Sequence, residues 1–378
     1  MNDYWEAVRG EFPVTQKWIY FNHAGVAPIP LRTAAAIRIY AEEAAIHGAC
    51  LYDHWMDQVE RVRRQCAGLV GADAQEIAFV KNTSHGLSLV ANGLDWKRGD
   101  NIVTIQGEFP SNIYPWMNLQ DRGAELRTVA PREGRIFLED LERALDQKTR
   151  LLTLSSVEFG TGFRNDLESI GRMCREKKVL FCVDAIQSLG LLPMDVKRWH
   201  VDFLAADGHK WLLAPEGQGI FYCARERLEL LHLALVGWNS VRRHRDFSHY
   251  DFTLRGDAQR FEEGTWNFVG TRALGASLEL LLEIGVGKIE ERVLGLTDKI
   301  VAGLQERGYV VRSPRGEGEK SGIVSFLTKR PAERVQGALM KKGVVSAARD
   351  GGLRVSPHFY NSEAEVDLFW GLLEEADA

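Results

Sequence analysis

An aspartate and a lysine are the side chains whose types and spacing point most directly to chemistry. Asp184 closes the apolar run Phe181–Asp184, and Lys210 follows the run Phe203–Asp207 after Gly208 and His209. The interval of 26 residues (210 − 184) is about one strand plus a crossover, so both side chains should lie at the same edge of neighbouring parallel strands. A lysine can form a Schiff base, and an aspartate can hold a pyridinium nitrogen protonated. A buried structural ion pair is the alternative interpretation.

A second candidate site lies in the segment Lys81-Asn-Thr-Ser-His-Gly86, which joins a predicted strand to a predicted helix. Hydroxyl groups and free N–H groups at the start of a helix can bind a phosphate. The alternative is an ordinary helix cap, for which serine and threonine are preferred residues. Thr83 and Ser84 are therefore candidates for phosphate binding or for capping.

The elements that must position these side chains alternate along the chain from about residue 77. Short β-rich runs alternate with amphipathic helical stretches, which predicts a mostly parallel sheet covered by helices. The predicted strands are Ile77–Val80, Asn101–Ile105, Glu125–Val129, Leu151–Ser155, Leu180–Val183, Phe203–Ala206 and Ile220–Cys223. The predicted helices between them are Ser84–Leu94, Asn112–Asp121, Leu138–Leu145 and Leu167–Glu176.

The pattern changes after Thr265, where long helices over 271–308 precede a mixture of strands and helices. Strands are predicted at Ile323–Leu327 and near Leu353–Ser356, and helices near Ala332–Lys342 and from Glu363. We therefore expect an N-terminal arm at 1–25 that packs with the small domain, a large domain at 26–264 and a small C-terminal α+β domain at 265–378.

Composition and motifs exclude several classes of protein. The formal charge of 47 − 52 = −5, with both signs interspersed, argues against nucleic-acid binding. No apolar run approaches the roughly 20 residues that span a membrane, and no secretory leader is recognisable. Five cysteines without a CxxC pair favour a reducing compartment, so we expect a cytoplasmic protein. GxGxxG, GxxxxGK[ST] and HExxH motifs are missing, so neither a nucleotide site nor a metal site is predicted.

Taken in order, six segments resemble the class V aminotransferase family of fold-type I enzymes, which use pyridoxal 5′-phosphate (PLP). This family includes cysteine desulfurases, C–S lyases and the isopenicillin N epimerase group. The resemblance implies an α/β fold of the fold-type I PLP-dependent transferase type. It has a large domain with a mostly parallel seven-stranded sheet and a small C-terminal α+β domain. The matching segments are 20–25, 82–86, 184–187, 208–210, 261–265 and 354–358.

The resemblance also implies a role for each matching residue. Lys210 would form the internal aldimine with PLP and shuttle protons at the substrate α-carbon, and Asp184 would pair with the pyridinium nitrogen. A free lysine has a pKa of roughly 10.4, so the site must lower it. Phe109 would stack on the cofactor ring, and Gln187 would donate a hydrogen bond to the ring 3′-oxygen. The phosphate would be bound by Thr83, Ser84 and His209, and by Thr265 from the second subunit of a homodimer. A small amino-acid substrate would be bound by Asn22, Ala24 and Arg354, with Arg354 on its α-carboxylate.

Three departures from the desulfurases narrow the expected reaction. Phe109 stands where they carry a histidine, Val157 stands where they carry an asparagine, and no cysteine follows Cys223 to act as a nucleophile. We therefore expect epimerisation, C–S lysis or amino transfer at the α-carbon. The alternatives are sulfur release like that of cysteine desulfurase or selenocysteine lyase, without a cysteine nucleophile, and a non-catalytic partner protein that retains the PLP fold.

Overall fold

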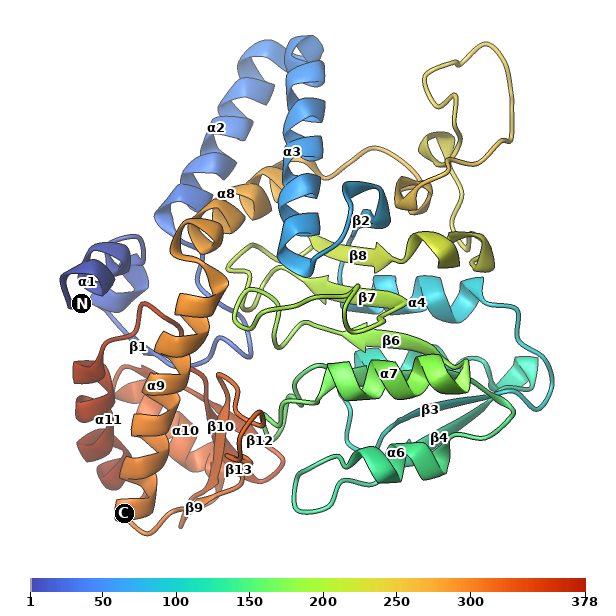
Figure 1. Cartoon of the computed structure of the whole chain (residues 1–378). Helices are drawn as coiled ribbons and strands as arrows, with labels where there is room; N and C mark the ends of the chain where they lie inside the picture. Colours follow the sequence, from blue (N-terminus) through green and yellow to red (C-terminus); the bar gives the residue numbers. More distant parts are fainter. Residues whose placement is uncertain (1) are drawn as a thin grey trace.

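A seven-stranded sheet forms the centre of the large domain (Figure 1). The computed structural model describes residues 2–378, so Met1 of the predicted arm lies outside the described residues. The strand order is β2-β8-β7-β6-β5-β3-β4; β8 runs antiparallel to both neighbours and the other pairs are parallel. Each predicted strand is present, with its ends within two residues of the prediction. The bounds are β2 Ile77–Val80, β3 Asn101–Ile105, β4 Glu125–Val129, β5 Thr149–Ser155, β6 Leu180–Asp184, β7 Phe203–Asp207 and β8 Gly219–Cys223.

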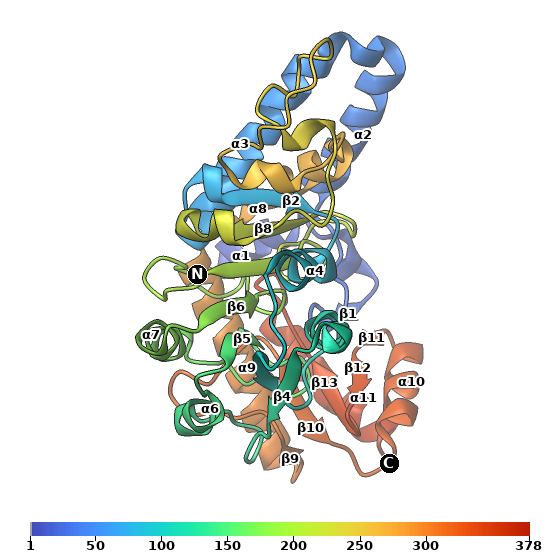
Figure 2. The ribbon, with the colours of Figure 1, turned by 90° about the vertical axis from the view of Figure 1, so that its right-hand side faces the viewer.

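Helices cover both faces of this sheet. In Figures 1 and 2, α4 (Thr83–Gly93) lies on one face, and α6 (Leu138–Ala144) and α7 (Leu167–Lys177) lie on the other. Every residue of β3, β7 and β8 is buried. Strands covered on both faces need apolar side chains on both, which explains their nearly continuous apolar runs.

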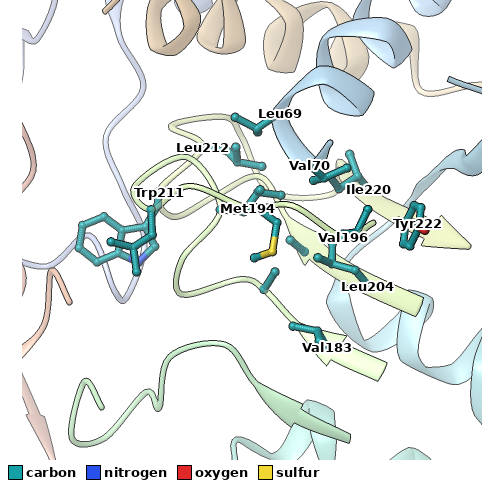
Figure 3. Packing of buried hydrophobic residues seen from close by; sticks show 14 of the residues in the cluster. Leu69, Val70, Val183, Met194, Val196, Leu204, Trp211, Leu212, Ile220 and Tyr222 are labelled. Carbon is teal, nitrogen blue, oxygen red and sulfur yellow. The ribbon is translucent and has the colours of Figure 1, made fainter. Parts of the chain in front are cut away.

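The apolar core beside the sheet includes the residue that follows Lys210. Figure 3 shows Val70, the last residue of α3 (Tyr52–Val70), beside Ile220 of β8, in the apolar cluster that also contains Val183 of β6. Trp211 is fully buried in the same cluster. Because Trp211 follows Lys210 directly, this packing anchors the backbone at the lysine.

Two long helices precede the sheet, at positions for which the sequence pattern gave no prediction. They are α2 (Leu31–His47) and α3, and both pack against α8 (Phe268–Ile284). Thr33 is the one residue of α2 that is buried among those described. A helix with so small a buried face lacks the apolar stripe on which sequence-based recognition depends.

The predicted helix at 112–121 is wrong as a continuous element. The structure has a 3₁₀ turn at Pro110–Asn112, the short helix α5 (Tyr114–Met117) and a second 3₁₀ turn at Gln120–Arg122. Pro115 lies in the first turn of α5, where its ring and missing N–H prevent a helix from continuing through it.

The small domain has its own sheet and its own apolar core. Its strand order is β12-β13-β10-β9, and its core consists of residues between Leu296 and Ala376 together with Phe21 of the N-terminal segment. The N-terminal segment contains α1 (Asn2–Arg9) and β1 (Ile19–Tyr20), and β1 pairs in parallel with β11 (Val344–Val345). The remaining bounds are β9 Val310–Val311, β10 Val324–Leu327, β12 Ala347–Arg349, β13 Gly352–Val355, α9 Val286–Glu306, α10 Ala332–Lys341 and α11 Glu363–Ala376.

Helix α8 packs with the large domain although it follows residue 264. Its buried leucines belong to the apolar cluster of the large domain, and Gly285 separates it from α9. We propose a domain division at this turn, and the division at 264/265 stays a prediction. Within the described residues, the helices include none that is long and apolar enough to cross a membrane.

Candidate active site

The carboxyl ends of the parallel strands open into a cavity of about 260 Å³. Its walls come from the large-domain sheet and α4, from the N-terminal segment and from strands β12 and β13 of the small domain. This is the edge at which open α/β sheets bind ligands. Nine of the predicted site residues line it: Ala24, Thr83, Ser84, Phe109, Asp184, Gln187, His209, Lys210 and Arg354.

Lys210 reaches this cavity from the loop that follows β7. Its side chain is only 7% exposed, and burial lowers the pKa of its amine to about 8 although Asp184 opposes the shift. The side-chain amine lies 5.5 Å from the centre of the Phe109 ring. A buried amine with a lowered pKa is partly neutral near pH 8 and can act as a nucleophile or a base.

Asp184 ends β6 and is almost fully buried. One of its carboxylate oxygens accepts a hydrogen bond of 3.0 Å from the backbone N–H of Ile186. Burial raises the pKa of Asp184 to about 6, against the opposing effects of that hydrogen bond and of Lys210. A carboxylate in such surroundings gains strongly from a cationic partner.

Gln187 is fixed by hydrogen bonds at both ends of its amide. Its oxygen accepts from the indole N–H of Trp211 at 3.0 Å, and its nitrogen donates to the carbonyl of Ala24 at 3.1 Å. The amide nitrogen carries two hydrogens, so one remains available to the cavity. These contacts also join the N-terminal segment to the lysine loop.

The start of α4 lies at another wall of the cavity. Asn82 caps this helix by accepting from the N–H of His85 at 2.9 Å. The Thr83 hydroxyl accepts from the N–H of Asp207 at 3.1 Å, and the Ser84 hydroxyl donates to Ser111 at 2.8 Å. Since Asn82 is the capping residue, capping does not account for the two hydroxyls.

The aromatic ring of Phe109 forms part of the wall and remains 41% exposed. It meets Phe159 edge to face, with ring centres 5.3 Å apart. Arg354 on β13 is buried beside them, and it donates to the carbonyl of Phe159 at 2.7 Å. Burial and the nearby Arg349 lower the pKa of Arg354 to about 10, which leaves its guanidinium charged at neutral pH.

Two predicted residues lie outside this cavity. Thr265 lies in a separate cavity of about 140 Å³ with Lys81, His85 and others, and its role from a second subunit stays a prediction. Asn22 is bridged to Ser356 through the backbone, and its side-chain amide lies 2.7–2.9 Å from the position of a β-carbon on Gly25. A side chain at position 25 would therefore displace the Asn22 amide. The role of Asn22 as a substrate residue stays a prediction.

Several functional groups were not assigned from the sequence. Arg349, Ser111 and Phe159 line the cavity, and Glu108 and Glu158 are buried next to it. Glu108 and Glu158 each follow the end of a strand by three residues, a position that could have identified them as it identified Asp184. Among residues 2–378, no group of three or more histidine, cysteine, aspartate or glutamate side chains could hold a metal ion.

The donor set of the cavity fits PLP. Two hydroxyls at a helix start suit a phosphate, and an exposed aromatic face suits the flat ring. A buried carboxylate suits a pyridinium nitrogen, and a buried amine suits the aldehyde. His209 adds an imidazole to the wall of the cavity, and its Nδ1 lies 3.0 Å from a carboxylate oxygen of Asp207.

Comparisons with known proteins give the same result. The family profile described as aminotransferase class-V matches residues 19–369. A probable cysteine desulfurase of Pyrococcus abyssi is 32% identical over 399 residues, covering 98% of this chain and 97% of that protein. The apo structure of a cysteine desulfurase from Thermococcus onnurineus NA1 has a TM-score of 0.90 and 30% identity, with 98% of each chain covered.

A structure of the cystine C–S lyase C-DES with its reaction product cysteine persulfide shares the fold. It has a TM-score of 0.89 and 24% identity, and covers 97% of this chain and 99% of that one. The predicted fold class and the predicted cofactor, PLP, are confirmed by these matches. The chain belongs to the class V aminotransferase family of PLP-dependent enzymes.

Proposed function

We propose that this enzyme acts at the α-carbon of a small amino acid, with Lys210 as the amine that carries PLP. The observation that supports this most directly is that Lys210, Asp184 and Arg354 face one cavity. These are an amine, a carboxylate and a buried guanidinium, each suited to a different part of the reacting assembly. Bound PLP supplies an electron sink for the α-carbon.

Proton transfer, substrate binding and cofactor binding are assigned to different residues of the cavity. The Lys210 amine moves a proton at the α-carbon, which its lowered pKa permits near neutral pH. Asp184 stabilises the protonated ring nitrogen, and Arg354 binds the α-carboxylate through its planar guanidinium. Thr83, Ser84 and His209 hold the phosphate, while Phe109 and Gln187 position the ring.

We further propose that the reaction ends without a persulfide on the protein. The five cysteines are free; Cys50 is exposed, and the other four are buried and do not line the cavity. Burial raises the pKa of each of those four thiols, so they are not thiolates at neutral pH. This favours epimerisation, C–S lysis or amino transfer.

A second candidate function is sulfur release from a cysteine-type substrate, with sulfide or a small persulfide as the product. It is supported by relatives described as probable cysteine desulfurases and by the fold of the C–S lyase. Phe109 cannot donate a proton to a sulfur intermediate, so the proton would come from Lys210 or from water.

We also propose a homodimer in the cytoplasm. Figures 1 and 2 show that α2, α3 and the loop around 241–256 project from one end of the molecule. This end carries exposed apolar side chains, among them Ile46, Phe247 and Phe252. Such surfaces are typical of contacts between chains. The free cysteines support a reducing compartment.

The proposed function is tested by incubating the holoenzyme with a panel of L- and D-amino acids. Keto acid, pyruvate, sulfide and the enantiomer of each substrate are measured, with Lys210→Ala as the control. We expect at least one of these products, and none from the control.

A variant with all five cysteines replaced by serine or alanine should retain turnover if it folds. Loss of turnover in a well-folded single cysteine variant would contradict the proposal of a reaction without a protein persulfide.

A further inference from the structure

The carbonyl group next to the lysine receives a hydrogen bond from the small domain. Trp211 follows Lys210 in the lysine loop, residues 208–213, and is fully buried. Its backbone carbonyl lies 3.3 Å from Nε2 of the buried His358. Among residues 2–378, no other group donates to this carbonyl. A buried carbonyl without a donor is costly, so this contact fixes the chain beside the lysine.

The hydrogen bonds of His358 determine which of its ring nitrogens carries a hydrogen. Nδ1 accepts from the backbone N–H of Phe359 at 2.9 Å, so Nδ1 carries none. In the neutral ring the hydrogen is therefore on Nε2, which donates it to the carbonyl of Trp211. Burial lowers the pKa of His358 well below its usual value, so the ring is neutral at neutral pH. His358 is thus a donor to the lysine loop.

The lysine loop needs contacts from outside because its own conformation is strained. Leu213, three residues after the lysine, has a positive φ angle of 57°, which is unfavourable for a residue with a side chain. Its carbonyl accepts from the Ser277 hydroxyl at 2.7 Å, and the carbonyl of His209 accepts from the N–H of Ala27 at 2.8 Å. The surrounding structure therefore holds the loop, and His358 is part of that support.

The segment that carries His358 also carries the arginine proposed for the substrate carboxylate. Arg354, on β13, lies four residues before His358 and is buried as well. Between them, the carbonyl of Ser356 accepts from Nδ1 of His23 at 2.8 Å, and its hydroxyl accepts from the N–H of Ala24 at 3.0 Å. This segment is therefore held at its middle, contacts the cavity at one end and contacts the lysine loop at the other.

Resting on the proposed function, we infer that His358 is a positioning residue that holds Lys210 at a fixed place relative to Arg354. It acts through the carbonyl of Trp211, since it does not line the cavity itself. Proton transfer at the α-carbon depends on the exact place of the amine, and a displacement of about 1 Å can cost roughly a hundredfold in rate. A donor that fixes the loop therefore contributes to turnover from outside the cavity.

The first test follows the capture of PLP by the apoenzyme, by absorbance, as a function of pH. Neutral amine attacks the aldehyde, so the rate in wild type should rise with pH through about 8. His358→Met is similar in size and has no N–H. A lysine held less firmly is better hydrated, so its midpoint should move by about one pH unit towards the free-lysine value of roughly 10.4. The charged groups that act on this amine are the same in every variant: Asp184, Asp207, Arg349 and Arg354.

Two further variants separate positioning from stability. His358→Gln, whose amide N–H can replace the one on Nε2, should keep a midpoint near that of wild type. The matched control is Tyr360→Phe, which removes a buried hydrogen bond of 2.6 Å to His23 in the same cluster. This control should lower the urea midpoint of unfolding and leave the pH profile of PLP capture unchanged.

Turnover of the holoenzyme gives a second readout, with the most active amino acid of the panel as substrate. In His358→Met, kcat should fall by roughly ten- to a hundredfold, as for a displaced catalytic group. KM should change little, because Arg354 is kept. His358→Gln should recover most of kcat, and Tyr360→Phe should retain it.

A wild-type pH profile and kcat in folded His358→Met would overturn the inference. The same changes in His358→Gln or in Tyr360→Phe would also overturn it, because they would trace the effect to general loosening of the cluster. If His358→Met does not fold, His358→Asn takes its place, since the shorter amide does not reach the carbonyl of Trp211. Failure of the proposed function looks different, because then Lys210→Ala captures PLP as wild type does.

Discussion

Asp184 and Lys210 owe their chemical properties to burial. Removal from water favours the uncharged form of each, so the carboxyl pKa rises to about 6 and the amine pKa falls to about 8. PLP in this cavity would present a ring nitrogen to the carboxylate and an aldehyde to the amine. The sequence predicts both residues because each follows an apolar strand. It could not predict Arg349, because the direction of its side chain depends on the register of a hairpin.

Replacing Asp184 with asparagine keeps the size of the side chain and removes its charge. We expect turnover to fall by roughly 10²–10³-fold, since a fixed charge that stabilises the transition state is lost. PLP binding should weaken less, by about tenfold, as for one charge-assisted hydrogen bond. Steady-state kinetics and PLP titration of the apoenzyme measure the two effects. Turnover close to wild type in a variant that binds PLP would show that Asp184 does not support the ring nitrogen.

Three neighbouring strands of the sheet each lead into a buried carboxyl group. Asp184 ends β6, Glu158 follows β5, and Glu108 follows β3. Glu108 accepts from the N–H and hydroxyl of Ser155, and Glu158 accepts from Asn165. Burial raises the pKa of Glu108 to about 7 and that of Glu158 well above its usual range, and the negative neighbours add to both shifts. Glu108 and Glu158 therefore stay protonated to higher pH than exposed glutamates do, and they lie beside the cofactor site.

The folded protein should lose stability relative to Glu108→Gln as pH rises. The pKa of Glu108 in the fold lies above its value of about 4.3 in an unfolded chain. At pH values between these two pKa values, Glu108 carries a proton in the folded protein but not in the unfolded chain. The stability that this proton contributes is lost as pH rises through about 7. Urea unfolding midpoints at pH 5 and pH 8 test this, with the exposed Glu216→Gln as the control. Parallel pH profiles for wild type and Glu108→Gln would contradict the assignment.

Elements with strong local patterns were predicted well, and the others were not. The β-rich runs between glycine and polar residues predicted the seven strands of the large sheet. Helix α2 was not predicted, because so few of its residues are buried. The helix predicted at 112–121 is interrupted at Pro115, despite the apolar spacing of its residues. The N-terminal pairing of β1 with β11 joins residues more than 300 positions apart, which no local pattern shows.

The candidate active site is complete only where three parts of the molecule meet. The large domain supplies the residues for PLP, the N-terminal segment supplies Ala24, and the small domain supplies Arg349 and Arg354. Thr265 lies in another cavity, next to the start of α4 that holds Thr83 and Ser84 in the first. The resemblance predicts that Thr265 serves a neighbouring subunit, which requires a dimer.

Sedimentation of the holoenzyme should give a dimer at micromolar concentration. Phe247→Glu, in the projecting loop, should weaken the dimer because it places a charge on an exposed apolar surface. Leu368→Glu, on the exposed face of α11, should leave the dimer intact. A wild-type monomer with full PLP occupancy and turnover would contradict a site shared between subunits.

The attachment of PLP to Lys210 is the claim on which the rest of the account depends. The most direct measurement is reduction of the holoenzyme with borohydride, followed by digestion and mass-spectrometric mapping of the labelled peptide. The account predicts that the label lies on Lys210, that Lys81→Ala retains it and that Lys210→Ala loses it. A label on Lys81 or on another lysine, or an unlabelled enzyme that still turns over amino acids, would contradict the account.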